Sequence, residues 1–160
     1  MKLYLVRHSV AVDYGQAVSD AERTLTESGI KRAHAMGAYL HSMDINPNII
    51  ISSTFERAIH TAQILAKELH YDGDIPQEQR ITPMGRYEGF CDLVNENIEH
   101  EDMMFVGHEP MMSMLVANIC ADGLFRMEFK KCGVCCVEIH RFRPTVKGEL
   151  LWYFTHKLLR

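Results

Sequence analysis

Three short apolar runs, with helical patterns between them, place the strongest constraint on how this chain folds. They cover residues 3–6, 48–51 and 103–106. Apolar runs of this length without alternation are typical of strands buried on both faces of a sheet. Strands that alternate with helices form a mainly parallel sheet whose crossover helices cover both faces. The sequence therefore predicts an α/β fold with three layers, α/β/α, around a mainly parallel central sheet.

Helical patterns lie between these runs and after the last one. In residues 29–43, apolar or small residues recur at spacings of three and four behind Thr26, which we expect to cap the helix. The same spacing runs through residues 53–69, which open with the capping-box pattern Ser-Thr-Phe-Glu. Pro110 predicts the start of a third helix, because proline is favoured at the first helical position. These helices would supply the two outer layers.

The C-terminal part of the chain departs from the alternation of strands and helices. Residues 134–142 and 150–154 are two extended runs, and residues 144–148 between them contain proline and glycine. This pattern predicts an antiparallel hairpin at one edge of the sheet. We expect residues 72–80 to form a loop. A chain of 160 residues is long enough for one substantial core, so we expect a single domain over residues 1–160.

Composition and charge exclude several classes of protein. The net charge of -4 argues against a nucleic-acid binder, which normally carries a basic face. No apolar run approaches the length that a membrane-spanning helix needs, so we expect no membrane partner. The N-terminal apolar run meets charge at Arg7, too early for a secretory signal. These features predict a cytoplasmic protein.

Five cysteines raise the question of metal or redox chemistry. Cys132 and Cys135 form a CxxC pattern, but they lie in an alternating run in which positions three apart point to opposite faces. A zinc site would also need a second pair of ligands, and the chain has no second CxxC. We therefore interpret these residues as buried strand cysteines and predict neither a metal nor a cofactor.

Polar residues follow each of the three apolar runs. The first run ends in Arg7-His8, the second is followed by Ser53 and Arg57, and the third ends in Gly107-His108. Ligands of α/β sheets bind beyond the carboxyl ends of the strands, so these side chains are expected to meet. Arginine and helix N-termini favour phosphate oxygens, and a neutral histidine is a competent nucleophile. The chain lacks a glycine-rich loop with its lysine, which argues against nucleoside triphosphate chemistry.

At these positions the sequence resembles the histidine phosphatase superfamily, whose fold is phosphoglycerate mutase-like. The motifs are Arg7-His8-Ser9, the Ser-x-x-x-Arg-Ala-x-x-Thr-Ala stretch over residues 53–62, and Gly107-His108. An Arg-x-Leu-Thr-x-x-Gly element over residues 23–29 makes the chain most similar to phosphohistidine phosphatases of the SixA type. One departure is Ser9, which stands where the family has glycine. Serine there would narrow the pocket or require an ordinary backbone conformation.

The resemblance implies roles for particular residues. His8 would be the nucleophile that takes the phosphoryl group, and Arg7, Arg57 and His108 would surround its oxygens. Further substrate contacts are expected from Ser9, Ser53, Arg23 and Glu109. Instead of contacting the substrate, Ser53 could equally cap its helix. Arg23 could likewise be a solvated surface residue. Glu88 and Glu109 are the candidates for an acid that protonates the leaving group.

The resemblance further implies a metal-independent phosphatase that works through a covalent phosphohistidine on the enzyme and releases inorganic phosphate. Only 50 residues lie between Arg57 and His108, which leaves no room for a large lid. An open pocket admits phosphohistidine displayed on a protein, such as a histidine phosphotransfer domain, and an imidazole leaving group needs less help from an acid. One alternative is a phosphatase for a small-molecule phosphate monoester. Another is a catalytically silent module that binds phosphorylated partners. The oligomeric state is left open.

Overall fold

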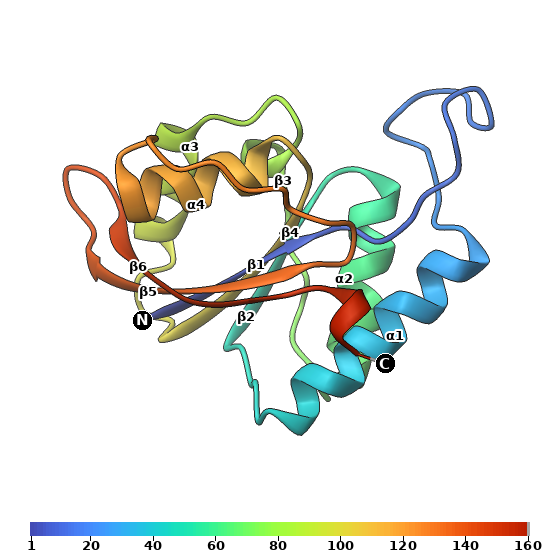
Figure 1. Ribbon diagram of the computed structural model, residues 1–160, viewed down its shortest axis with the longest axis horizontal. Coiled ribbons are helices and arrows are strands. Elements are labelled where there is room, and N and C mark those ends of the chain that lie inside the picture. Colours follow the sequence, from blue (N-terminus) through green and yellow to red (C-terminus); the bar gives the residue numbers. More distant parts are fainter. Residues whose placement is uncertain (160) are drawn as a thin grey trace.

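The computed structural model describes residues 1–159, which form one six-stranded sheet between two pairs of helices (Figure 1). The strand order is β3-β2-β4-β1-β5-β6. In chain order the elements are β1 (Lys2–Arg7), α1 (Glu27–Ser42), β2 (Ile49–Ser53), α2 (Glu56–Glu68), β3 (Gln77–Glu78), the 3-10 turn η1 (Gln79–Ile81), α3 (Tyr87–Glu96), β4 (Asp102–Gly107), α4 (Met111–Ala121), β5 (Val134–Arg141), β6 (Lys147–Phe154) and the 3-10 turn η2 (His156–Leu158).

The sheet is parallel over four strands and antiparallel at one edge. β4 pairs in parallel with both β1 and β2, and β2 pairs in parallel with β3. β5 runs antiparallel to β1, and β6 runs antiparallel to β5. In Figure 1, α1 and α2 cover one face of the sheet, and α3 and α4 cover the other. The predicted α/β/α arrangement with a mainly parallel sheet and an antiparallel edge hairpin is confirmed.

Both faces of the central strands are buried, as the unbroken apolar runs predict. Leu3 and Leu5 of β1 belong to the core under α3 and α4, whereas Tyr4 and Val6 belong to the core under α1 and α2. A fully buried side chain of this size contributes about 1.5–3 kcal/mol to stability. The two cores hold β1 and β4 rigidly in the centre of the sheet, and these are the strands that end in Arg7 and Gly107.

The structure confirms one predicted helix cap and corrects another. The backbone N–H of Gly29 donates to the Thr26 hydroxyl at 3.0 Å, so Thr26 caps α1. By contrast, α2 begins at Glu56, and its N-cap residue Phe55 makes no side-chain bond. The capping-box prediction at Ser53 is wrong, because Ser53 is the last residue of β2. The third helix, α4, begins one residue later than predicted, with Pro110 as its N-cap.

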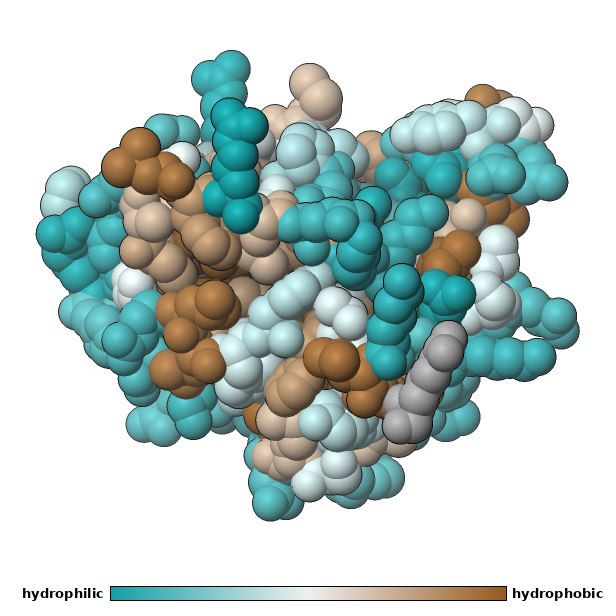
Figure 2. Space-filling view, viewed as in Figure 1, coloured by the Kyte–Doolittle hydropathy of each residue, from teal (hydrophilic) through white to brown (hydrophobic). Residues whose placement is uncertain are grey.

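Two further features differ from the sequence-based expectation. Residues 72–80 are not loop throughout, since the short strand β3 and the start of η1 lie within them. The helix α3 was not predicted, although Tyr87, Phe90, Cys91 and Val94 follow helical spacing and are all buried. Hydrophobic surface is exposed over the β5–β6 hairpin (Figure 2). Leu150 and Leu151 of β6 are each about two-fifths exposed.

The cysteines of the CxxC pattern point to opposite sides of the sheet. Cys132 packs in the core under α1 and α2, and Cys135 packs in the core under α3 and α4. Cys132 itself lies in a turn before β5, with a φ of 57°. All five thiols are free. Within residues 1–159, no helix combines the length and the apolar character that crossing a membrane requires.

Candidate active site

The four residues at the strand exits converge on one cavity of about 270 Å³. Arg7 at the end of β1 is directly paired with Gly107 at the end of β4, so the next residues, His8 and His108, emerge side by side. Their ring centroids are 4.9 Å apart. The cavity is lined by Arg7, His8, Tyr14, Asp20, Arg23, Arg57, Pro83, His108, Glu109 and Lys131.

The hydrogen bonds of His8 determine which of its two ring nitrogens carries the proton. Arg57 Nε donates to His8 Nε2 at 3.1 Å, and His8 Nδ1 lies 2.6 Å from the carbonyl oxygen of Ser9. Because a guanidinium only donates, Nε2 must carry the lone pair and Nδ1 the proton. Burial, together with His108 and the guanidiniums of Arg57 and Arg7, holds the pKa of His8 well below its usual value. His8 is therefore neutral, with an unprotonated Nε2 whose lone pair accepts from Arg57.

Arg57 is held in place by a carboxylate from the loop after β1. Its Nη2 lies 3.1 Å from Asp20 Oδ2, and its Nη1 donates to the Asp20 carbonyl. Asp20 Oδ1 accepts a second bond at 2.8 Å from Arg23 Nη1, and Arg23 Nε donates to the carbonyl of Val12. Although burial opposes it, the two guanidiniums hold the pKa of Asp20 below its usual value. Asp20 is therefore an ionised carboxylate that neutralises part of the positive charge.

His108 is tied to the end of the neighbouring strand. Its Nε2 lies 2.8 Å from the hydroxyl oxygen of Ser53, and its ring packs edge-on against Phe55 with centroids 5.0 Å apart. Burial and the guanidinium of Arg57 lower the pKa of His108 to about 3, while Asp20 opposes this shift and Arg7 adds a smaller lowering. The protein groups around His108 thus keep its imidazole neutral.

Two buried nitrogen atoms in this cavity have no hydrogen-bond partner. Arg7 Nη1 donates to the carbonyl of Phe129 at 2.6 Å, but Arg7 Nε has no partner, and neither does His108 Nδ1. Within residues 1–159 only one other buried side-chain nitrogen or oxygen is unpaired, the Oδ1 of Asn95. Buried polar atoms are normally satisfied, so two unpaired atoms in one cationic cavity suit an anionic ligand.

The remaining predicted residues have different positions. Arg23 is only 8% exposed and lines the cavity, so the solvated alternative for it is wrong. Glu109 also lines the cavity, with its carboxylate accepting a bond from the backbone N–H of Ser113 at 2.9 Å. Glu88 is exposed and lines a different depression beside η1. Ser9 and Ser53 are buried behind the catalytic histidine candidates and do not line the cavity.

Serine fits the position where the resemblance predicts glycine. The hydroxyl of Ser9 donates to the carbonyl of Gly29 at 2.7 Å, and its backbone N–H donates to the Thr61 hydroxyl at 3.1 Å. Ser9 is not among the non-glycine residues of the described chain that have a positive φ. The backbone therefore does not require glycine there, and the serine side chain is satisfied away from the cavity.

Four lining residues were not predicted from the sequence: Tyr14, Asp20, Pro83 and Lys131. Tyr14 lies in the long loop after β1, and its ring packs on the Arg23 guanidinium at 4.1 Å. Lys131 comes from the turn before β5. The only local signal was the spacing of Asp20 and Arg23, three residues apart in a segment without strand or helix pattern.

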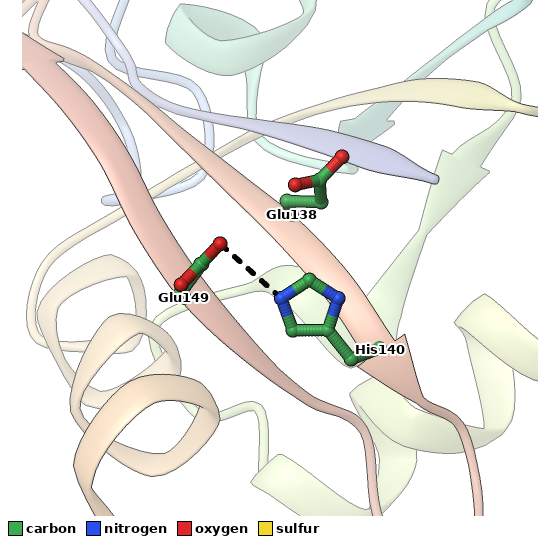
Figure 3. A group of neighbouring side chains, drawn as sticks. All are labelled: Glu138, His140 and Glu149. Atoms are coloured by element: carbon green, nitrogen blue, oxygen red, sulfur yellow. Dashed lines mark ion pairs between the residues drawn. The ribbon is translucent and has the colours of Figure 1, made fainter.

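A separate group of charged side chains lies at the opposite end of the sheet. Glu138, His140 and Glu149 project from the β5–β6 hairpin, and His140 Nε2 lies 3.4 Å from a Glu149 oxygen (Figure 3). Glu138 is in register with Lys2, at the start of β1, whereas the cavity lies beyond the end of that strand. This group is therefore not part of the cavity.

Comparisons with known proteins agree with this geometry. A family model described as "Histidine phosphatase superfamily (branch 1)" matches residues 3–90. A serine/threonine-protein phosphatase Pgam5 of Drosophila ananassae is 43% identical over 70 residues, which are 44% of this chain and 24% of the relative. This chain thus spans about a quarter of the Pgam5 relatives that it matches. An uncharacterized protein of Picosynechococcus sp. is 32% identical over 114 residues, 69% of this chain and 67% of that protein.

Similar solved structures extend over nearly the whole chain. The protein histidine phosphatase SixA complexed with tungstate has a TM-score of 0.90 at 22% identity, with 100% of both chains covered. A structure described as a putative phosphohistidine phosphatase SixA from Agrobacterium tumefaciens has a TM-score of 0.81 at 22% identity, covering 96% of this chain and 97% of that chain. At these identities the likeness establishes the fold.

The burial of His108 predicts how stability depends on pH. In the unfolded chain a histidine takes up a proton below about pH 6.5, whereas folded His108 stays neutral until about pH 3. The unfolded state therefore binds more protons in this window, and stability falls as the pH falls. His108→Asn should flatten the dependence of the unfolding free energy on pH between pH 6 and 4, by up to about 1.4 kcal/mol per pH unit. Urea unfolding measures this, and equal slopes in both proteins would contradict it.

Proposed function

This chain belongs to the histidine phosphatase superfamily, and we propose that it removes the phosphoryl group from phosphohistidine on a protein, through a phosphohistidine formed on His8. The observation that carries the proposal is the neutral His8, whose Nε2 lone pair is held beside two guanidiniums. Membership of the superfamily supports a hydrolase activity. The choice of phosphohistidine rests on the shape and chemistry of this chain's own cavity.

In the first step, His8 Nε2 attacks phosphorus and the P–N bond of the substrate breaks. Arg7, Arg57 and His108 surround the transferred group and stabilise the negative charge spread over its oxygens. The departing imidazole nitrogen takes a proton from solvent. In the second step, water attacks phosphorus, the bond to His8 Nε2 breaks, and inorganic phosphate leaves with His8 neutral again. The cationic side chains make this chemistry possible without a metal ion or other cofactor.

The cavity offers the leaving group little acid catalysis, which favours an imidazole. Asp20 is held as a carboxylate by Arg23 and Arg57, so it does not carry a proton to donate. Glu109 directs its carboxylate to the first turn of α4, where the N–H of Ser113 binds it. An imidazole leaves more readily than an alkoxide, so it depends less on a proton from the enzyme. Phosphohistidine fits such a site better than an alkyl phosphate.

We predict that the enzyme becomes transiently labelled on His8. After mixing with a ³²P-phosphohistidine protein, rapid quenching should trap an acid-labile, base-stable label on the chain, because a phosphoramidate forms at Nε2. His8→Ala should abolish both the label and phosphate release, by at least about 1000-fold, since the nucleophile is lost. The matched control His140→Ala removes an exposed histidine at the far end of the sheet and should keep both. Full turnover by His8→Ala would contradict the proposal.

A phosphate monoester is the second candidate substrate. It is favoured by the Pgam5 relatives, which are named serine/threonine-protein phosphatases and share 43% identity over 70 residues in one case. A monoester would need a proton for its leaving oxygen. Glu109 is the cavity carboxylate that is not paired with an arginine in the described chain, so it would have to supply that proton.

Glu109→Gln separates the two substrates. With phosphohistidine as substrate, we expect less than about a threefold loss of kcat/KM, because imidazole leaves without the acid. With an alkyl monoester such as phosphoserine, the loss should be about 100-fold, the usual size of a general acid contribution. Steady-state phosphate release on both substrates measures the ratio. Activity confined to the monoester, lost in Glu109→Gln, would establish the second candidate instead.

A binding module without catalysis is the remaining alternative. It would have no use for a histidine held neutral with an unprotonated Nε2, so the geometry of His8 supports the enzyme. Tight binding of a phosphohistidine protein without phosphate release would show that the chain is a binding module and not an enzyme. We also propose that residues 1–160 act as one catalytic domain in the cytoplasm, where all five free thiols would stay reduced.

A further inference from the structure

A second cavity adjoins the phosphate cavity and is lined by positive charge. It has a volume of about 290 Å³ and shares Arg7 and Lys131 with the phosphate cavity. Its other cationic walls are Arg32, Lys130 and Lys157, and we call this cavity the basic groove. These residues come from α1, the turn before β5 and the C-terminal segment, so the fold gathers them from distant parts of the sequence.

The positive charge of the basic groove is only partly neutralised. Of the described residues that line it, Glu128 is the one acid, and it pairs with Lys130. Partial burial and the nearby guanidiniums of Arg7, Arg23 and Arg32 lower the pKa of Lys131, as expected where cations crowd together. The chain as a whole carries a net charge of -4. A concentration of cations on an acidic protein points to an anionic ligand at this place.

We propose that the basic groove binds an acidic segment of the phosphorylated partner protein, next to the phosphorylated residue. This inference rests on the proposed function and names the kind of substrate that it favours. Sharing Arg7 and Lys131 places the groove within one or two residues' reach of a phosphoryl group at His8. Carboxylates that flank the phosphorylated residue would therefore meet Arg32, Lys131 and Lys157.

The arrangement of the cations suits several carboxylates better than one compact second phosphate. A single phosphate is usually bound by convergent, bidentate donors such as paired arginines. Apart from Arg7, which it shares with the phosphate cavity, the groove offers one arginine, Arg32, and three lysines with exposed side chains. Such a surface attracts extended acidic sequences through long-range charge, which raises the association rate and is screened by salt.

The test compares two peptides on the His8→Ala protein, which can bind but not turn over. Both peptides carry the same stable phosphohistidine analogue, one flanked by Asp and Glu and the other by Asn and Gln. Fluorescence anisotropy gives the ratio of their dissociation constants. We expect the acidic peptide to bind about five- to tenfold more tightly at low salt, with the preference declining as salt rises.

Two charge-matched double variants assign the preference to the groove. Arg32→Gln with Lys157→Gln should reduce the ratio toward one, because both side chains line only the basic groove. Lys2→Gln with Lys67→Gln removes the same charge from exposed sites outside both cavities and should leave the ratio unchanged. Thermal unfolding of each variant verifies that it folds.

The possible failures are distinguishable. Equal binding of the two peptides, or equal loss in both double variants, would overturn the basic groove while the phosphohistidine proposal stands. Failure to bind either peptide, with no phosphate release by the unmodified chain, would overturn both. Inorganic pyrophosphate is a third probe. The contradicting result is that pyrophosphate displaces the peptide with neutral flanks much better than phosphate does, and only while Arg32 and Lys157 are present. In that case the groove binds a second phosphate, and the proposal that it binds an acidic segment is wrong.

Discussion

The chemistry of this site depends on a single hydrogen bond, from Arg57 Nε to His8 Nε2. An arginine that donates to a histidine nitrogen requires a lone pair there, and the Ser9 carbonyl holds the ring proton on the other side. The same guanidinium thus orients the imidazole, keeps it neutral and lies where a phosphoryl oxygen would need a positive charge. In the proposed reaction, the nucleophile and its electrostatic partner are thus positioned before any substrate binds, which favours phosphoryl transfer.

A buried guanidinium next to a histidine is costly unless another group compensates its charge. Asp20 provides that compensation, and it does so from a loop, with Arg23 as its second partner. The long segment between β1 and α1 therefore contributes to the site through one carboxylate. The strands carry the reacting groups, and this loop carries the counter-charge that allows those groups to be buried together.

This division explains what the sequence could predict. Arg7, His8, Arg57 and His108 follow recognisable strands or open a helix, and strand order brings such positions to one edge, so periodicity and motif sufficed for them. Asp20, Tyr14 and Lys131 lie in loops, where no periodic pattern constrains the direction of a side chain.

Ser53 shows a different limit, because its local sequence matches a helix cap. In the structure, the Ser53 hydroxyl instead forms a hydrogen bond with the imidazole of His108, so a tertiary contact overrides the local preference. The unpredicted helix α3 had a readable apolar spacing, but short apolar runs of that kind are ambiguous without a cap.

Ser9 connects the nucleophile to the two helices behind it. Its hydroxyl donates to the Gly29 carbonyl of α1, its N–H donates to the Thr61 hydroxyl of α2, and its own carbonyl accepts a hydrogen bond from His8 Nδ1. Gly29 must lack a side chain there, since a Cβ would lie 2.1 Å from the carbonyl oxygen of Val10. Glycine at position 9 has no hydroxyl, so it could not make the hydrogen bond to the Gly29 carbonyl. The serine therefore adds a fixed point to the carbonyl that sets the tautomer of His8, and a residue that departs from the family pattern reinforces the geometry on which the proposed catalysis depends.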